Sequence, residues 1–309
     1  MPAAATEEFS VVLGMPHLGR SGLNESALLK IVGHDRWKLF AEISGVPTDK
    51  IADAFENRLY ATFCFVELLL PPERPLSAYD ENDCLKFSRD LTHYGRIYLD
   101  GYYKLKSGGP FSVRCTNVFI YQLAGPQQLK MAQPENCDFT NIPELTSQPD
   151  SLNLCRAAKA EGTFQAPIPN RGNLGSRVVD YPLDPDRDAN GAGLIYFANF
   201  VCFLDFAERT LLNERGAPID LIDARSTFWR RTGYFANAMF DDRLEISITG
   251  GVEILEDRLV VMAFDYRMSR ASDGKLVLIS AARKSAKLTP AAQSWIADLK
   301  EPGSEHQHG

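Results

Sequence analysis

One segment, residues 196–214, is apolar on nearly every side of a helix, and this limits how the chain can fold. Its polar residues Asp205, Glu208 and Arg209 fall within one turn of each other. The apolar residues are Phe200, Val201, Cys202, Phe203, Leu204, Phe206, Ala207, Leu211 and Leu212. Such a helix must be covered by other elements on several sides. Its most apolar part is interrupted by Asn199 and Asp205 and is too short to span a bilayer, so we expect no membrane association.

Runs rich in aromatic and β-branched residues follow this helix, and turn residues separate them. The predicted strands cover residues 219–230, 243–249, 258–268 and 275–284. The first part of the chain has the same order, with a helix at 25–40 and strands at 59–70, 83–88, 96–105 and 111–123. A helix followed by antiparallel strands therefore occurs twice, which indicates an internal repeat.

A curved antiparallel sheet folded around each helix would cover it on several sides, and this arrangement is the hot-dog fold. We therefore predict an α+β protein with a tandem (double) hot-dog fold, in which each half is a long central helix wrapped by a curved antiparallel sheet. The predicted units are an N-terminal domain at 10–124, a connecting segment at 125–192 with a short helix near 152–160, a C-terminal domain at 193–290 and a disordered tail at 299–309. Two unrelated α+β domains are the alternative.

The composition narrows the classes of function. The 309-residue chain has a formal net charge of −7, which argues against nucleic-acid binding because that binding depends on clustered Lys and Arg. The first ten residues lack the pattern of a signal peptide, so we expect a cytoplasmic protein. The six cysteines are scattered without a CxxC pair, so we expect reduced thiols and no metal.

Two sets of motifs resemble known hot-dog families. The segment Gly193-Leu-Ile-Tyr-Phe-Ala-Asn-Phe, which leads into the second helix, resembles the hydroxybenzoyl-CoA-thioesterase branch of the superfamily. In the first half, Gly14-Met-Pro-His17 and Arg58-Leu-Tyr60-Ala-Thr62-Phe resemble the double hot-dog acyltransferase/decarboxylases of leinamycin biosynthesis.

The second resemblance implies a function. It implies decarboxylation of a malonyl- or methylmalonyl-type CoA thioester and delivery of the acyl (propionyl) group to an acyl carrier protein in polyketide-type biosynthesis. It also implies that Tyr60 is the key residue. The CoA thioester is then a substrate, and no cofactor is expected.

The thioesterase branch offers an alternative, which depends on one carboxylate. Its members carry Asp-x-x-Gly shortly before the Tyr-Phe-Ala-Asn segment. Counted back from Tyr196 without a gap, the Asp position holds Asn190, and an amide can neither take a proton nor form an anhydride. Asp188 has the right spacing to Gly191 and restores the motif only if two extra residues are accommodated. An acyl-CoA or acyl-carrier-protein thioesterase using Asp188 is therefore the second hypothesis, and a non-catalytic acyl-thioester-binding module is the third.

Decarboxylation needs donors aimed at the thioester oxygen, where negative charge develops, and a weakly solvating pocket for the carboxylate. Asn199, near the start of the second helix, and Thr227, on the next strand, are the candidate donors. A helix cap and an ordinary strand threonine are the alternative interpretations. Tyr60 could take the acyl group as a nucleophile or act as a hydrogen-bond donor, and a half-buried strand tyrosine is the alternative.

The candidate substrate-binding residues are His17, Thr62, Arg230 and Arg231. His17 precedes a helix and could approach the substrate carboxylate, although a surface loop histidine is the alternative. Basic residues of the second half could contact a phosphate, dock an acidic carrier protein or form a solvated face; these are Arg230, Arg231, Arg243, Arg283 and Lys284. We expect one working site, where the strand of Tyr60 faces the second helix, and a homodimer is possible.

Overall fold

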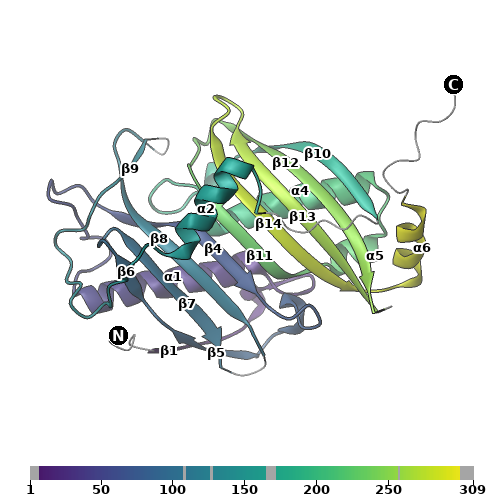
Figure 1. The fold of residues 1–309 in the computed structure, drawn as a ribbon, viewed down its shortest axis with the longest axis horizontal. Helices are drawn as coiled ribbons and strands as arrows, with labels where there is room; N and C mark the ends of the chain where they lie inside the picture. The colour runs from purple at the N-terminus through teal and green to yellow at the C-terminus, as the bar shows by residue number, and fades with distance from the viewer. Residues whose placement is uncertain (1–6, 107–108, 126–127, 165–171, 257, 300–309) are drawn as a thin grey trace.

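In the computed structural model, the described residues are 7–106, 109–125, 128–164, 172–256 and 258–299. Within these ranges, the strands form one 12-stranded antiparallel sheet to which both parts of the chain contribute (Figure 1). A short hairpin of β2 (Leu18–Gly19) and β3 (Gly22–Leu23) lies outside it.

The N-terminal half contributes one side of the sheet. Its strands lie in the order β1 (Glu7–Val12), β5 (Cys84–Arg89), β7 (Tyr98–Leu105), β8 (Ser112–Gln122) and β4 (Tyr60–Leu69), with β6 (Thr92–Tyr94) paired to β7 and β9 (Leu129–Met131) paired to β8. The long helix α1 (Glu25–Ser44) packs on this part of the sheet (Figure 1). It begins at Asn24, whose side chain accepts a hydrogen bond from Ala27 N, and ends at Gly45, whose φ of 70° suits glycine.

The C-terminal half repeats this arrangement. Its strands lie in the order β11 (Ser226–Tyr234), β14 (Leu276–Lys287), β13 (Leu259–Arg270), β12 (Arg243–Leu255) and β10 (Asn173–Pro182). The central helix α4 (Phe200–Glu214) follows a 3-10 turn, η3 (Phe197–Asn199). The shorter helices are α3 (Pro185–Asp188), α5 (Ile219–Ala224) and α6 (Pro290–Asp298), and short 3-10 turns occur at Met15–His17 and Leu76–Ala78.

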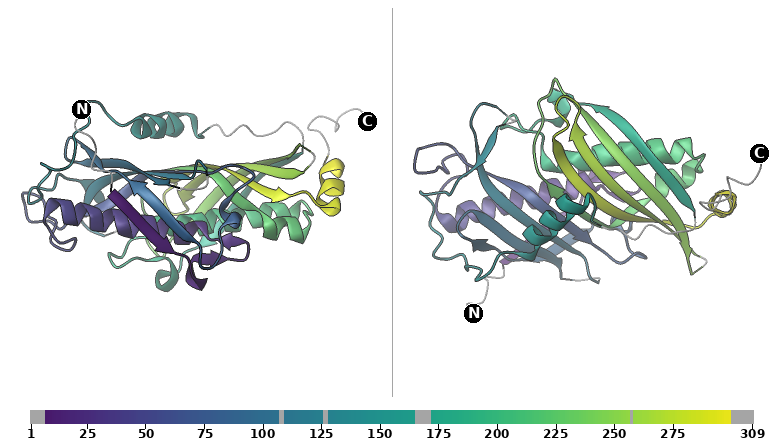
Figure 2. Two further views of the ribbon diagram at one scale, coloured as in Figure 1. Left: turned by 90° about the horizontal axis from the view of Figure 1, so that it is seen from below. Right: turned by 45° about the horizontal axis from the view of Figure 1, so that its top comes forward.

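The halves join where β4 pairs with β11, over Phe65–Leu69 and Trp229–Gly233. Helices α1 and α4 lie on one face of the continuous sheet, while α2 (Asp150–Glu161) lies on the opposite face (Figure 2). Each half is therefore a long helix against a curved antiparallel sheet, and the predicted α+β double hot-dog fold is confirmed.

The apolar body of α4 is buried as its pattern predicts. Phe203, Leu204, Ala207 and Leu211 are at most 1% exposed and belong to the core of the second half.

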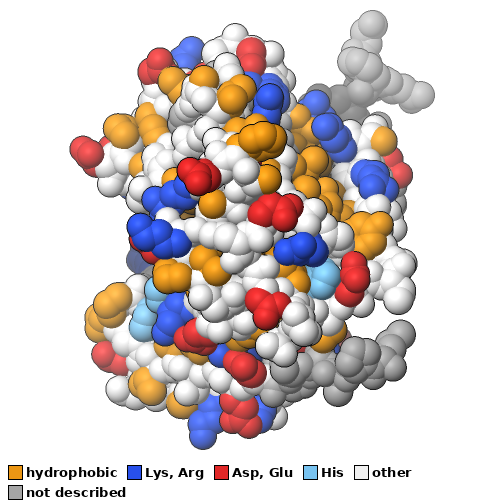
Figure 3. Space-filling model, turned by 90° about the vertical axis from the view of Figure 1, so that its left-hand side faces the viewer, with side chains coloured by type: hydrophobic (Ala, Val, Ile, Leu, Met, Phe, Trp, Pro, Cys, Tyr) orange, Lys and Arg blue, Asp and Glu red, His pale blue; other side chains and the backbone are white. Residues whose placement is uncertain are grey.

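Among the described helices, none combines the length and the apolarity that crossing a bilayer requires. On the face shown in Figure 3, basic and acidic side chains are intermixed rather than separated by sign.

Several predicted boundaries differ from the structure. Residues 219–224, predicted as the start of a strand, form α5, because Pro218 and Asp220 suit a helix N-terminus and the strand begins only at Ser226. Residues 125–192, predicted as a connection, also contribute β10 to the sheet of the second half. This strand lies at the edge and buries few side chains, so it lacks an apolar pattern. The predicted tail at 299–309 lies outside the described residues beyond Leu299.

Candidate functional site

Tyr60 lines a cavity of about 300 Å3 between the two halves. Three elements form its walls: one face of α1, the beginning of β4 and the loop that enters α4. The lining side chains include His34 and Trp37 from α1, Arg58, Tyr60, Thr62 and Phe63 from the β4 segment, and Asn190, Leu194, Tyr196 and Phe197 from the loop. We call this cavity the Tyr60 pocket. The sequence predicts a site where the strand of Tyr60 faces the second helix. In the structure, α1 and the loop before α4, rather than α4 itself, complete the pocket.

Polar groups of this pocket are free to meet a ligand. The hydroxyl groups of Tyr60 and Thr62 have no hydrogen-bond partner within the described ranges. The guanidinium carbon of Arg58 lies 4.9 Å from the centre of the Tyr60 ring, which is a cation–π distance. The predicted substrate-binding residue Thr62 therefore lies in the same pocket as Tyr60.

The loop that enters α4 is held in shape by its own side chains. Asn190 Oδ1 accepts hydrogen bonds from the backbone N of Ala192 and Leu194, at 2.9 and 3.1 Å. The Asn190 amide nitrogen has no partner within the part of the chain that the structure describes. An amide donor therefore stands at the position that the ungapped count from Tyr196 assigns to the acid of the thioesterase motif.

Close packing of the loop against α1 depends on Gly33. A Cβ at this position would lie 2.7 Å from Phe197 Cε1 and 3.1 Å from the Tyr196 hydroxyl oxygen. Phe197 is stacked on Phe63, with ring centres 3.8 Å apart. Burial raises the pKa of Tyr196, so its hydroxyl stays protonated at neutral pH and can donate a hydrogen bond.

Asp188, the acid of the thioesterase hypothesis, does not line the Tyr60 pocket. Its side chain is buried, and its two oxygens accept hydrogen bonds from Nε and Nη2 of Arg187, each at 2.8 Å. One of these oxygens also accepts from Asp184 N at 3.0 Å. This carboxylate is therefore occupied in holding the turn before the loop.

Asn199 also supports the loop. Its amide nitrogen donates to the backbone oxygens of Asp188 and Arg187, at 3.2 and 3.4 Å, and its side chain does not cap the helix. Asn199 does not line the Tyr60 pocket. The amide that was predicted to stabilise the oxyanion therefore holds the backbone before the loop, because residues 187 and 188 lie next to the start of α4.

Thr227 and Arg230 belong to a buried network of charges on the other side of the interface. Thr227 Oγ1 and Arg230 Nε each donate to Glu25, at 2.7 Å. Behind them, Glu208 is fully buried and pairs with Lys284 at 2.6 Å. Burial alone would raise the pKa of Glu208, but Lys284, together with Arg225 and Arg230, outweighs it and lowers the pKa to about 2.

A second interface cavity, of about 350 Å3, is built from the loop before α1, the start of β11 and the middle of α4. The members of the network that line it are Glu25, Arg225, Thr227 and Lys284. The internal repeat makes it the counterpart of the Tyr60 pocket. Thr227 precedes Phe228 on β11 as Thr62 precedes Phe63 on β4. Register shifts lie close by, between Thr227 and Trp229 on β11 and between Phe63 and Phe65 on β4. The structure thus places Thr227 and Arg230 at the opposite site from Tyr60, which the sequence pattern did not resolve.

The remaining candidates lie outside the Tyr60 pocket. Arg231 pairs with Glu67, at 2.8 Å from Nε. His17 Nδ1 accepts a hydrogen bond from Gly14 N at 2.9 Å, so the imidazole stabilises its own turn. Arg283 pairs with Glu253 at 3.1 Å.

His34, Trp37 and Arg58 were not predicted as site residues, although Arg58 begins the motif that contains Tyr60, and all three line the Tyr60 pocket. The sequence does contain one indication of this face of the helix, which is Gly33. A glycine inside a helix costs stability, so its presence suggests close packing or a function at that position. His34 and Trp37 follow this glycine in α1, and all three line the pocket. The described residues contain no group of three or more His, Cys, Asp or Glu side chains arranged to hold a metal ion.

Comparisons with known proteins identify the fold. No protein-family model matches the sequence, and no curated protein matches it. A crystal structure of a putative oleoyl thioesterase from Lactobacillus plantarum has a TM-score of 0.63 at 8% identity, covering 94% of this chain and 98% of that chain. The fold is a double hot-dog.

Two further structures support this conclusion. An acyl-ACP thioesterase from Bacteroides thetaiotaomicron has a TM-score of 0.55 at 13% identity, covering 90% of this chain and 97% of that chain. The 12:0-ACP thioesterase from Umbellularia californica has a TM-score of 0.52 at 11% identity, covering 92% and 94%. Identities this low show a common fold, and the function must be argued from the site.

Proposed function

We propose that this protein is an enzyme acting on acyl thioesters, which decarboxylates a malonyl- or methylmalonyl-type CoA thioester and transfers the acyl group to an acyl carrier protein. One observation carries the proposal: among the described residues, no Asp or Glu lines the Tyr60 pocket, whereas hydroxyl, amide, imidazole and guanidinium groups do. Hydrolysis in the manner of Asp-x-x-Gly enzymes needs a carboxylate at this place, but decarboxylation does not.

The pocket supplies what decarboxylation requires. The bond between the carboxylate carbon and the α-carbon breaks, CO2 leaves, and the electron pair forms an enolate whose charge lies on the thioester oxygen. Tyr60, Thr62 and Asn190 offer donors for that oxygen. Trp37 and Phe197 make the surroundings weakly solvating, which destabilises the substrate carboxylate relative to the transition state. Arg58 attracts the anionic substrate.

The α-carbon then takes a proton from the Tyr60 hydroxyl, which regains one from water, and this gives the propionyl or acetyl thioester. In the transfer step, the carrier thiol forms a new thioester and the CoA thiol leaves. Tyr60 either carries the acyl group as an ester between these two thiols or donates a hydrogen bond to the carbonyl oxygen in a direct transfer. Both roles need the Tyr60 hydroxyl to be free of protein partners.

The test is incubation with malonyl-, methylmalonyl- and propionyl-CoA, with and without a carrier protein, followed by intact mass and CO2 release. We expect CO2 and an acylated carrier, and a loss of about 100-fold or more in Tyr60→Phe. Tyr121→Phe, on β8 and outside the pocket, is the matched control and should keep full activity. Full activity of Tyr60→Phe would exclude this residue from the chemistry.

A thioesterase is the second candidate, and two observations favour it. The three solved structures described above are thioesterases. His34 lines the pocket and could act as a general base toward water in place of Asp188. Free acid without CO2, abolished in His34→Gln and retained in Asp188→Asn, would establish this function instead. Binding of acyl-CoA without any product would indicate a non-catalytic binding module.

A further inference from the structure

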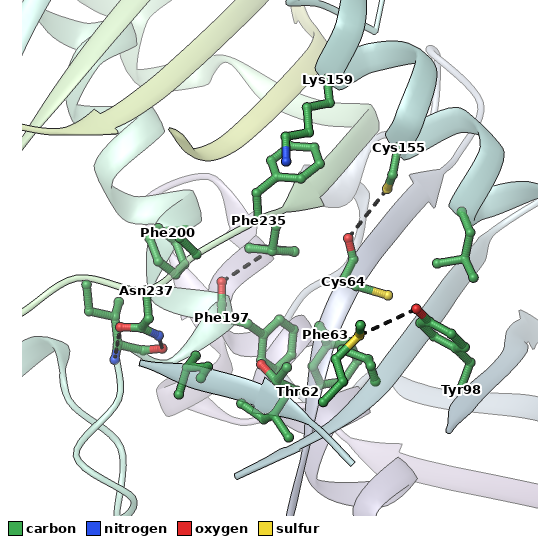
Figure 4. A pocket seen from close by; sticks show the side chains of 18 of the residues that line it. Thr62, Phe63, Cys64, Tyr98, Cys155, Lys159, Phe197, Phe200, Phe235 and Asn237 are labelled. Carbon is green, nitrogen blue, oxygen red and sulfur yellow. Dashed lines mark hydrogen bonds between the residues drawn. The ribbon is translucent and has the colours of Figure 1, made fainter. Parts of the chain in front are cut away.

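A third cavity, of about 440 Å3, lies beneath α2 (Figure 4). It adjoins the Tyr60 pocket. Thr62, Phe63, Ile195 and Phe197 line both cavities. The volume is typical of a small-molecule site. A malonyl or propionyl group is small enough for the Tyr60 pocket alone, so this cavity has room for another part of the substrate.

We propose that the cavity beneath α2 binds the phosphopantetheine arm that CoA and acyl carrier proteins share, with the phosphate at Arg156 and Lys159. This inference rests on the proposed action on acyl thioesters, but it does not depend on whether the reaction is decarboxylation or hydrolysis. It assigns a role to α2, which lies outside both hot-dog halves in the connection between them.

The charges at α2 suit a phosphate. Arg156 and Lys159 are three residues apart on the helix and both line the cavity, so they lie on the same face. Arg156 donates only to the neutral side chains of Asn153 and Gln148, at 3.2 and 2.6 Å. Lys159 Nζ lies 5.6 Å from the centre of the Phe235 ring, beside which it extends in Figure 4. Neither cation has a carboxylate partner within the described ranges, so both can bind an anion.

The walls suit the rest of the arm, which has two amides separated by short apolar segments. Tyr98 donates only to Met131 Sδ, at 3.6 Å, and a thioether is a weak acceptor. Burial raises the pKa of Tyr98, so its hydroxyl remains a donor for an amide carbonyl. The apolar lining includes Val118, Ile120, Leu129 and Leu152. The thiol end of the arm would reach Thr62, two residues from Tyr60 on β4.

The first test measures binding without turnover. Isothermal titration of the full chain with CoA, phosphopantetheine and pantetheine should show weaker binding of the two phosphorylated ligands, by about tenfold or more, in Arg156→Gln/Lys159→Gln. Pantetheine, which lacks the phosphate, should bind as before. Lys38→Gln, an exposed lysine of α1 outside the cavity, is the matched control. Equal losses for all three ligands, or no loss for any, would overturn the proposal.

A second variant tests the cavity itself. Leu152→Trp places a large side chain in the cavity and should weaken CoA and pantetheine alike, whereas Ala157→Trp, exposed on the same helix and outside the cavity, should not. Unchanged pantetheine binding in Leu152→Trp would overturn the proposed path of the arm. Steady-state assays of the double variant then distinguish CoA from the acyl carrier protein as the source of the arm. The substrate whose KM rises, acyl-CoA, the carrier or both, is the one whose arm uses the cavity. An unchanged KM for both overturns the proposal. The binding assays require no turnover. A failed binding test therefore overturns the role of this cavity, whereas an unexpected product in the turnover assay overturns the proposed reaction.

Discussion

Gly33→Ala tests how strictly the Tyr60 pocket depends on close packing between α1 and the loop that enters α4. The added Cβ would lie 2.7 Å from Phe197 Cε1 and 2.9 Å from Cζ, where an ordinary contact begins at 3.4 Å. The ring must therefore move by about 0.7 Å. Phe63, which is stacked on Phe197 with ring centres 3.8 Å apart, restricts the movement of this ring. The loop must move with it.

Two energies oppose each other in this variant. Alanine favours a helix over glycine by about 1 kcal/mol, and overpacking a well-packed site costs about 1–3 kcal/mol. We therefore expect Gly33→Ala to be destabilised by about 0–2 kcal/mol, so most of the protein remains folded. Activity should fall much more, by about 10- to 100-fold in kcat/KM, because a catalytic group misplaced by about 1 Å costs roughly that much.

The assay compares urea unfolding with steady-state turnover of the same preparation. Ala41→Gly, two turns further along α1, is the control; it should lose about 1 kcal/mol and keep its kcat/KM. A Gly33→Ala protein that is more stable than the wild type and equally active would refute the reasoning, since the alanine would then fit without displacing the loop.

Three further predictions concern charges and hydroxyl groups. Thr227→Val should lower the free energy of unfolding by about 1–3 kcal/mol, because buried Glu25 loses a hydrogen bond of 2.7 Å, and should keep its turnover. Thr62→Val, at the corresponding place on β4, should lower turnover and leave the urea midpoint unchanged. Asp188→Asn should keep most of its activity, measured as product formed, because the carboxylate does not line the pocket; complete loss in a folded variant would instead support hydrolysis that uses Asp188. The depressed pKa of Glu208 contributes stability that is present above its unfolded pKa near 4.5 and is lost as the pH falls toward 2. The free energy of unfolding, measured with urea, should therefore fall by on the order of 3 kcal/mol between these two pH values. In Glu208→Gln it should fall by less.

The fold could be predicted because it depends on local patterns. The apolar sides of residues 200–212 require a cover, and two similar orders of helix and strands supply it. The strand β10 escaped prediction because an edge strand buries few side chains, and α5 because a six-residue helix has too few turns to show a period.

The site could be predicted only in part. Tyr60, Thr62 and the loop with Asn190 are adjacent in the structure as the motifs indicate. Thr227 and Asn199 carry suitable groups, but their hydroxyl and amide are already bound, to Glu25 and to the backbone of the loop. A sequence shows which donors a segment has, and it does not show which of them other groups of the protein occupy.

The sequence by itself determined the double repeat, the two central helices and the strand that carries Tyr60, because periodicity and turn residues act over short distances. Only the tertiary structure decided at which of the two interface cavities the polar side chains are free of protein partners. Pairing of β4 with β11 brings α1 to the loop of the second half on one side, leaving Tyr60 and Arg58 around a cavity. On the other side it brings Glu25 to Arg230, and the long-range pairing of buried charges occupies the corresponding groups.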